Sequence, residues 1–274
     1  MVNARRRVGG EVRAARPHRH CLTGLFSASE MYHDHPLGHL YEIMPRSTRL
    51  KSFTDRYPYL GPLVWFATLE YFVIQYVVAA TWSTPYSLLR NPISDLGNTS
   101  CGVYDGRYVC SPQHWLMNFA FFALGVLMAA GAPLIHQEFR EHRLAFVGFG
   151  GMAIAGVGTV LVGLFPENVN HTAHVLGAAG PFLIGNVALI ILSLTLTIPT
   201  SVRVLTGIAG GIGLAGLFLF AIGVDLGLGQ GGMERVAAYP QTIWLIIFGV
   251  YMSKNHYLTR RQMRREIGLH GSAA

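Results

Sequence analysis

Residues 144–165 read LAFVGFGGMAIAGVGTVLVGLF, a stretch without a single charged side chain. About 20 apolar residues in an α-helix are enough to cross the hydrocarbon core of a lipid bilayer. This stretch has that length and that character. It therefore predicts a helix that spans a membrane.

Further runs of the same kind lie on both sides of this stretch. With it they make six, near 60–82, 113–135, 144–165, 173–197, 203–225 and 236–253. Of the 274 residues, 51% are hydrophobic and only 13% are charged, and the mean hydropathy is +0.36. Soluble domains carry about 25% charged residues. We therefore predict an all-α polytopic membrane protein whose six-helix transmembrane bundle covers residues 56–254.

Glycines are concentrated in the third and fifth of these runs. Small residues allow helix backbones to approach closely in lipid, where dispersion and weak hydrogen bonds hold helices together. A phosphate-binding loop would place Lys and then Ser or Thr directly after its glycines, and neither run does so. The glycines are therefore predicted to lie at helix–helix contacts. They are Gly148, Gly151, Gly156, Gly158, Gly163, Gly207, Gly210, Gly211, Gly213 and Gly216.

The two ends of the chain are polar and basic. Residues 1–55 are rich in Arg and His without an apolar period, which predicts a disordered cytoplasmic tail. Two alternatives remain open for this segment, a histidine metal tract and a true start at Met31 or Met44. Residues 255–274 are predicted to form a second basic cytoplasmic tail. No apolar stretch precedes Leu60, so we expect no signal peptide.

The basic residues also predict the orientation of the bundle. In a six-helix arrangement, the basic segments 46–56, 140–143 and 254–265 lie on one side of the membrane together with Arg203. Loops rich in Lys and Arg face the cytoplasm. We therefore expect a bacterial inner-membrane protein with both termini in the cytoplasm. The net charge of +7 sits mainly at the chain ends, so we expect no nucleic-acid partner.

The first outer loop, about 83–112, contains two of the three cysteines. Cys101 and Cys110 would face an oxidising compartment in this orientation, which favours a disulfide bond between them. Cys21 would then be unpaired.

Polar and ionisable side chains gather in the outer segments and at the outer ends of the helices. Ionisable groups at helix ends that face a bundle interior are candidates for function. The candidates are Ser94, Asp95, His114, Glu167, His171, His174, Asp225, Glu234, Arg235 and Tyr239. The same face carries only two other Arg residues, Arg90 and Arg107.

Structural roles are the alternative for several of these residues. Asp95 is suited to capping a turn, and Glu167 to the positive end of the fourth helix. Asp225 would sit at the unfavourable end of a helix dipole, so a salt bridge with Arg235 is the default expectation for that pair. Glu70 lies near mid-membrane and is expected either to be protonated and bonded to Asn118 or Asn186, or to line a wet cavity.

Three segments in order resemble one family of bacterial membrane proteins. They are RNPISDLG (90–97), CSPQHWLMN (110–118) and LFPEN (164–168), the last followed by His174-x-x-Gly-Ala. Together they resemble the DUF998 family, with a likeness that covers about 58–253. The resemblance implies a six-helix bundle that is loosely similar to the Frag1/DRAM/Sfk1 group. Its pattern singles out Ser94, Asp95, His114, Pro166, Glu167 and His174.

These observations are compatible with three functions. The first is a ligand-binding or accessory protein whose outer pocket binds a lipid headgroup or contacts another membrane protein or complex. The second is a zinc-dependent hydrolase or transferase acting on a lipid, with His114, His171 and His174 as ligands. Asp95 or Glu167 would then be the general base. The third is a haem protein with iron between His114 and His174.

The second hypothesis has its own distant resemblance. His114, His171 and His174 with Asp95 and Ser94 resemble the residue set of the transmembrane metal hydrolases that include alkaline ceramidases. That family is expected to have seven helices and late-chain histidines. Here no histidine lies between His174 and His256.

Overall fold

The computed structural model describes residues 53–140 and 143–271, with side chains up to Met263. These residues belong to one compact unit, 48–274. The predicted tail 1–55 and its histidines lie outside the described residues, apart from 53–55.

Six helices in the described part are long and apolar enough to cross a membrane, as predicted. They run over Leu60–Ala80, His114–Phe139, Arg143–Leu164, His171–Thr195, Thr200–Ala221 and Gly229–Met263. Short 3₁₀ or π segments divide some of them. The elements are α3 (Leu60–Phe66), η2 (Ala67–Leu69), α4 (Glu70–Ala80), α5 (His114–His136), η4 (Gln137–Phe139), α6 (Arg143–Leu164), α7 (His171–Ala179), η5 (Gly180–Gly185), α8 (Asn186–Thr195), α9 (Thr200–Ala221) and α10 (Gly229–Gly271).

The sixth helix differs most from its predicted bounds. It begins at Gly229, well before the predicted start at 236, and its backbone stays helical to Gly271 through the predicted tail 255–274. Glu234 and Arg235, which were expected to precede this helix, therefore lie inside it. The other five helices match their predicted bounds to within a few residues.

The fourth span is interrupted by a π-helical segment. Residues Gly180–Gly185 form η5 between α7 and α8, with Pro181 at its start. Proline lacks a backbone N–H, so the regular hydrogen-bond pattern of the helix is broken there. Single π turns inside α-helices often mark functional positions. Pro181 and Phe182 line the cavity described below.

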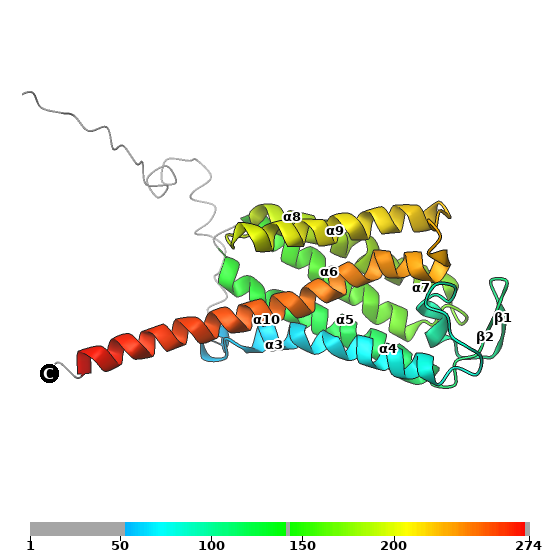
Figure 1. The fold of residues 1–274 in the computed structure, drawn as a ribbon, viewed down its shortest axis with the longest axis horizontal. Coiled ribbons are helices and arrows are strands. Elements are labelled where there is room, and N and C mark those ends of the chain that lie inside the picture. The colour runs from blue at the N-terminus through cyan, green and yellow to red at the C-terminus, as the bar shows by residue number, and fades with distance from the viewer. Residues whose placement is uncertain (1–52, 141–142, 272–274) are drawn as a thin grey trace, which may run out of the picture. The chain divides into compact units, whose positions relative to one another are not determined.

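The most extensive helix contact joins α5 and α6, which lie side by side in Figure 1. A Cβ atom on Gly125 would lie 2.5 Å from the carbonyl oxygen of Gly156, and one on Gly163 would lie 2.6 Å from that of Asn118. Only glycine permits this approach. Most of the glycines in the third and fifth apolar runs lie at such helix–helix contacts, as predicted. Gly211 differs, because a Cβ there would meet nothing within 4 Å.

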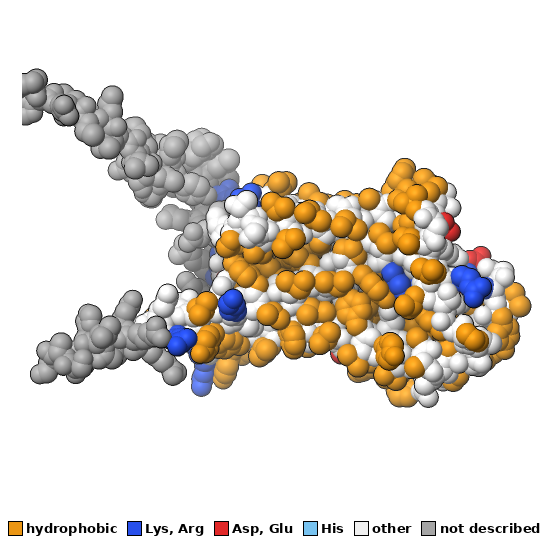
Figure 2. All heavy atoms as spheres, in the orientation of Figure 1, with side chains coloured by type: hydrophobic (Ala, Val, Ile, Leu, Met, Phe, Trp, Pro, Cys, Tyr) orange, Lys and Arg blue, Asp and Glu red, His pale blue; other side chains and the backbone are white. Residues whose placement is uncertain are grey.

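Large apolar side chains cover the flank of the bundle (Figure 2). Tyr76, Phe146 and Leu194 are each more than half exposed, at 77%, 66% and 71%. An exposed apolar surface of this extent marks an interaction site or contact with lipid. Together with six apolar helices, this surface identifies a multi-pass membrane protein.

Loops and a small hairpin close one end of the bundle, here called the hairpin end and made of residues 81–113, 165–170 and 222–228. Strands β1 (Gly102–Tyr104) and β2 (Arg107–Val109) pair antiparallel. Asp105 and Gly106 connect them with φ angles of 48° and 76°, the left-handed conformations that a two-residue hairpin turn requires.

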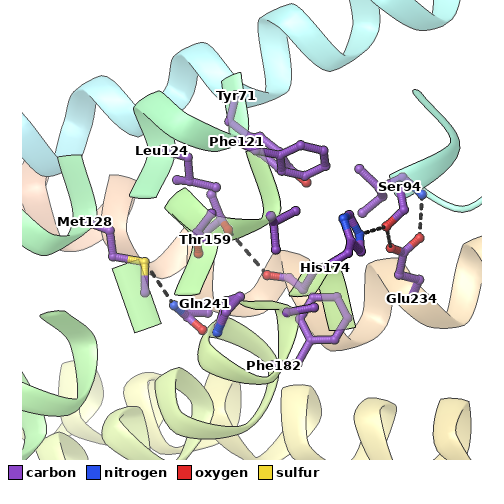
Figure 3. Close-up of a pocket in the computed structure, with 16 residues that line it drawn as sticks. Tyr71, Ser94, Phe121, Leu124, Met128, Thr159, His174, Phe182, Glu234 and Gln241 are labelled. Atoms are coloured by element: carbon purple, nitrogen blue, oxygen red, sulfur yellow. Dashed lines mark hydrogen bonds between the residues drawn. The ribbon is translucent and has the colours of Figure 1, made fainter. Parts of the chain in front are cut away.

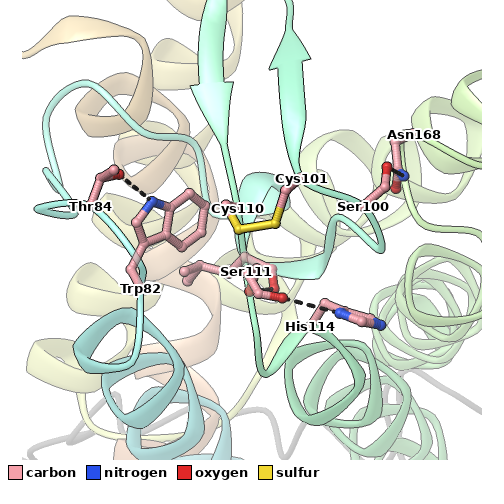
Figure 4. Close-up of a disulfide and its surroundings, with 9 residues drawn as sticks. Trp82, Thr84, Ser100, Cys101, Cys110, Ser111, His114 and Asn168 are labelled. Carbon is pink, nitrogen blue, oxygen red and sulfur yellow. Dashed lines mark hydrogen bonds between the residues drawn. A yellow bond between two sulfur atoms is a disulfide. The ribbon is translucent and has the colours of Figure 1, made fainter.

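The predicted disulfide is present at the base of this hairpin. Cys101 and Cys110 flank the two strands and are bonded to each other (Figure 4). Beside it, Nδ2 of Asn168 donates to the hydroxyls of Thr99 and Ser100, at 3.0 and 3.2 Å. These bonds attach the hairpin end to the segment that leads into α7.

Candidate functional site

Ser94, His174 and Glu234 form a hydrogen-bonded cluster at the hairpin end (Figure 3). The Ser94 Oγ atom lies 3.0 Å from His174 Nε2 and 3.1 Å from Glu234 Oε1. Ser94 begins the 3₁₀ helix η3 (Ser94–Gly97), His174 belongs to α7 and Glu234 to α10. Three segments that are far apart in the sequence therefore meet at one hydroxyl group.

The other ring nitrogen of His174 fixes the orientation of the imidazole. Nδ1 lies 2.9 Å from the carbonyl oxygen of Phe165, and since a carbonyl can only accept, Nδ1 must carry the proton. In a neutral imidazole this leaves Nε2 as an acceptor toward Ser94. Asn170 caps α7 by accepting from the N–H of Ala173, which holds this turn in place.

Glu234 is held on both carboxyl oxygens. Oε2 accepts the backbone N–H of Ile93, and Oε1 is bonded to Ser94. A serine hydroxyl has one proton and so donates only one hydrogen bond. The other bond must be donated to it, either by a protonated Glu234 or by a protonated His174. Besides the serine hydroxyl proton and the Nδ1 proton of His174, the cluster therefore holds one more proton, on Glu234 or on His174 Nε2.

The cluster lines a cavity of about 40 Å³ between the helices. A buried water needs roughly 10–15 Å³ of such space, so the cavity has room for a few small atoms. Ser94, His174 and Glu234 lie at the polar end (Figure 3). Most of the remaining lining is apolar, with Ile93, Phe121, Leu124, Met128, Val162, Ala178, Pro181, Phe182 and Ala238. Tyr71, Thr159, Gln241 and Thr242 complete the lining, and Thr159 and Gln241 lie away from the Ser94 cluster (Figure 3).

Asp95, next to the cluster in the sequence, forms an ion pair with Arg107. Its carboxylate is fully buried and accepts from Nε and Nη2 of Arg107, each at 2.7 Å. Asn91 adds a longer bond of 3.4 Å. Arg107 reaches this position from strand β2, so the hairpin is anchored to the core through a bidentate pair.

A family model described as "Protein of unknown function (DUF998)" matches residues 66–251. The chain belongs to the DUF998 family. This confirms the resemblance carried by the three segments above. No curated protein and no solved structure matches the chain.

Within this DUF998 protein, Arg235 lies beside the cluster but does not pair with Asp225. It donates to the carbonyl oxygens of Leu88, Asn91 and Gly231, each at 2.8 Å, and to the hydroxyls of Tyr86 and Tyr239. Asp225 instead accepts the N–H of Gly227 in an exposed turn. The expected salt bridge is therefore wrong. α9 ends at Ala221, which leaves Asp225 in the loop.

The three candidate metal histidines have separate partners. His114 Nδ1 lies 3.1 Å from the Ser111 carbonyl oxygen (Figure 4) and His171 Nδ1 lies 3.1 Å from the Tyr104 hydroxyl. Both ring nitrogens of His174 are already bonded. Among residues 53–140 and 143–271, no group of three His, Cys, Asp or Glu is placed to hold a metal ion. The structure thus brings His174 to Ser94 rather than to the other histidines.

The expected partners of Glu70 are engaged elsewhere. Asn118 donates to the Gly97 carbonyl, and Asn186 donates to those of Phe182 and Ala237. In the described part of the chain, neither carboxyl oxygen of Glu70 has a hydrogen-bond partner. The expected hydrogen bond between Glu70 and Asn118 or Asn186 is therefore absent among the described residues.

Sequence reasoning missed several residues of this DUF998 site. Arg107 was noted only as a basic residue on the outer side, although it pairs with Asp95. Tyr86 and Gln75 were not singled out, yet Tyr86 accepts from Arg235 and Gln75 accepts from Tyr239. A signal for Arg107 was available, because a buried Asp needs a partner and the outer segments hold few cations.

Glu167 lies next to the cluster with an unusual proton affinity. Its side chain is buried, and among described residues Oε1 has no hydrogen-bond partner. Burial, followed by the negative charges of Asp95 and Glu234, raises the pKa of Glu167 from 4.5 to about 8. The carboxyl is therefore largely protonated at neutral pH.

Replacing Glu167 with Gln is expected to flatten the pH dependence of stability. The folded protein holds this proton up to about pH 8, whereas the unfolded chain releases it near 4.5. The folded state therefore loses stability as pH rises through that window. Glu167→Gln should be close to the wild type at pH 5 and exceed it by a few kcal/mol at pH 9, since each unit of pKa difference corresponds to about 1.4 kcal/mol. Thermal unfolding in detergent at both pH values measures this.

Asp225→Asn is the matched control, since it removes an exposed carboxyl at the same end. It should follow the wild-type curve at both pH values. Equal pH dependence in Glu167→Gln and the wild type would show that Glu167 is ionised in the folded protein.

Proposed function

We propose that this DUF998 protein binds the polar headgroup of a membrane lipid at the cavity beside Ser94, His174 and Glu234. The observation that carries the proposal is the lining of the cavity, where the ionisable groups His174 and Glu234 gather with Ser94 at one end and most of the other side chains are apolar. Ligand sites are typically apolar hollows with a few placed polar groups. An amphiphile would match both parts of this lining.

The charges near the cavity favour a ligand that donates hydrogen bonds. Three carboxyl groups are buried here, and only Asp95 has a bidentate cationic partner. Arg235 directs its donors to carbonyl and hydroxyl oxygens. Glu234, which lines the cavity, is thus left to recognise a group that donates hydrogen bonds, such as the ammonium group of phosphatidylethanolamine.

The proposal includes the sidedness of the protein. Basic residues flank the opposite ends of the helices, and the Cys101–Cys110 bond lies at the hairpin end. Both features favour a cavity on the extracytoplasmic side, with both termini in the cytoplasm. In this arrangement the protein acts as a ligand-binding or accessory protein of the plasma membrane.

Photo-crosslinking to intact cells tests the binding and the sidedness together. The probe is a short-chain phosphatidylethanolamine with a diazirine on its acyl chain, added from outside. We expect crosslinks to peptides that line the cavity, and about tenfold fewer in Ala178→Phe, because Ala178 lines the cavity and a phenyl ring would fill it. Ala179→Phe is the matched control, since Ala179 is the next residue in the helix and its side chain is exposed instead of lining the cavity.

The outcomes separate the two parts of the proposal. Crosslinking only in inverted membrane vesicles would reverse the sidedness. Equal crosslinking in Ala178→Phe and Ala179→Phe would remove the cavity as the binding site.

A further inference from the structure

We infer that Ser94 is a nucleophile activated by His174, and that it accepts the acyl group of a lipid ester bound in the cavity and passes it to water or an alcohol. The inference rests on the proposed lipid binding and adds a reaction to it. Neither metal nor cofactor is part of the step.

The geometry supplies a nucleophile, a base and a group that orients the base. Ser94 Oγ and His174 Nε2 are 3.0 Å apart, within reach for proton transfer. The Phe165 carbonyl holds Nδ1–H at 2.9 Å and so directs the lone pair of Nε2 to the hydroxyl. This combination is the signature of an activated serine. Ser94 also lines the cavity, so a substrate in that cavity would meet the hydroxyl.

Glu234 acts as a positioning residue in this arrangement. Its Oε2 is bound to the N–H of Ile93, the residue before Ser94, and its Oε1 contacts the hydroxyl. When Glu234 is protonated it donates to Ser94, and the serine proton is then directed to His174. A glutamine at this position would make the same donation without a titrating proton.

The acyl-transfer step balances with these residues and one co-reactant. The Ser94 oxygen bonds to the ester carbonyl carbon while its proton moves to His174 Nε2. The bond from that carbon to the alcohol oxygen breaks, and the leaving alkoxide takes the proton from His174. Water or a second alcohol then attacks the acyl carbon and gives its proton to His174 Nε2. The bond from that carbon to the Ser94 oxygen breaks, and His174 returns the proton to Ser94. Hydrolysis yields a fatty acid, and attack by an alcohol yields a new ester.

The location of Ser94 favours an acyl ester as substrate. Ser94 lies at the ends of the membrane-spanning helices, the level where the ester groups of glycerolipids meet the headgroups. Beyond it, Phe121, Leu124, Val162 and Phe182 line an apolar space. The carbonyl group and first methylene groups of an acyl chain match that lining and its volume of about 40 Å³, and a free sugar or phosphate does not.

Covalent labelling of the full-length protein in lipid vesicles tests the inference. The probes are an alkyl fluorophosphonate and a fatty-acid p-nitrophenyl ester, with the modified peptide identified by mass spectrometry. We expect Ser94 to carry both adducts and Ser94→Ala to carry neither. His174→Gln should label at least about 100-fold more slowly than the wild type, as expected for removal of a general base. Ser100→Ala is the control and should label as the wild type does, since Ser100 is exposed but bonded to Asn168 rather than to a histidine.

The positioning role of Glu234 is tested with a pair of variants. Glu234→Ala should label at least tenfold more slowly, and Glu234→Gln should restore the rate. A merely structural role would not distinguish the two in proteins that elute as monodisperse, folded species. Equal loss in both variants would overturn the positioning role.

The remaining outcomes are distinct from those of the lipid-binding test. Absence of adducts at Ser94 in a protein that still crosslinks phosphatidylethanolamine overturns the nucleophile and leaves the binding site. Adducts at Ser94 without lipid crosslinks overturn the proposed binding and leave the nucleophile. A wild-type labelling rate in His174→Gln removes His174 as the base.

Discussion

Replacing Arg107 with Ala is expected to destabilise the bundle by about 3–5 kcal/mol, the usual effect of leaving one charge of a buried ion pair alone. Asp95 has no exposed side-chain surface and receives two bonds of 2.7 Å from the guanidinium. Without Arg107, Asp95 would keep its 3.4 Å contact with Asn91 and its hydrogen bond with Glu167, neither of which supplies a positive charge. Reversible unfolding from mixed micelles into dodecyl sulfate measures the change in free energy.

The double variant Arg107→Ala with Asp95→Asn provides the control. It removes both charges, so it should be more stable than Arg107→Ala alone by at least about 1 kcal/mol. Arg107→Lys should recover only part of the loss, because an ammonium cannot form the bidentate contact. A loss below about 1 kcal/mol in Arg107→Ala would show that water reaches Asp95 in the folded protein.

The membrane-spanning architecture could be predicted because each span contains a long, mostly apolar run, and lipid allows few other structures for such runs. The start of α10 could not be predicted in the same way. Its first turns contain Glu234 and Arg235, residues typical of a loop between spans. Their polar groups are satisfied by Ile93, Leu88 and Asn91, more than 140 residues earlier in the chain, so tertiary contacts decide the structure there.

The members of the candidate site were easier to predict than their pairing. Positive-inside reasoning placed Ser94, His174 and Glu234 at one end of the bundle, and the structure brings them into contact. The positive-inside rule does not specify which acidic side chain contacts which basic one. Asp225 was assigned to Arg235 because an acid at the C-terminal end of a helix dipole was expected to have a cationic partner. The Arg235 guanidinium donates instead to backbone carbonyl oxygens, two of them in a distant loop. A shared position on the outer face and the resemblance to metal hydrolases grouped three histidines that the fold gives to three different partners.

Replacing Gly156 with Ala is expected to destabilise the α5–α6 contact by about 3 kcal/mol, the upper end of the usual range for overpacking. A Cβ atom there would lie 2.6 Å from the backbone nitrogen of Ala129 and 2.6 Å from the carbonyl oxygen of Gly125. Both obstacles are backbone atoms of the neighbouring helix, so no side-chain rotation can relieve the clash. The two helices would have to separate and lose contacts along their length.

Gly150→Ala in the same helix is the matched control, because a Cβ at that position meets nothing within 4 Å. Alanine is the better helix former, so this variant should equal the wild type or exceed it by up to about 1 kcal/mol. The same micelle unfolding assay compares the two. Equal stability of both variants would mean that α5 and α6 shift apart at little cost, and close backbone packing would then not be what holds this pair of helices together.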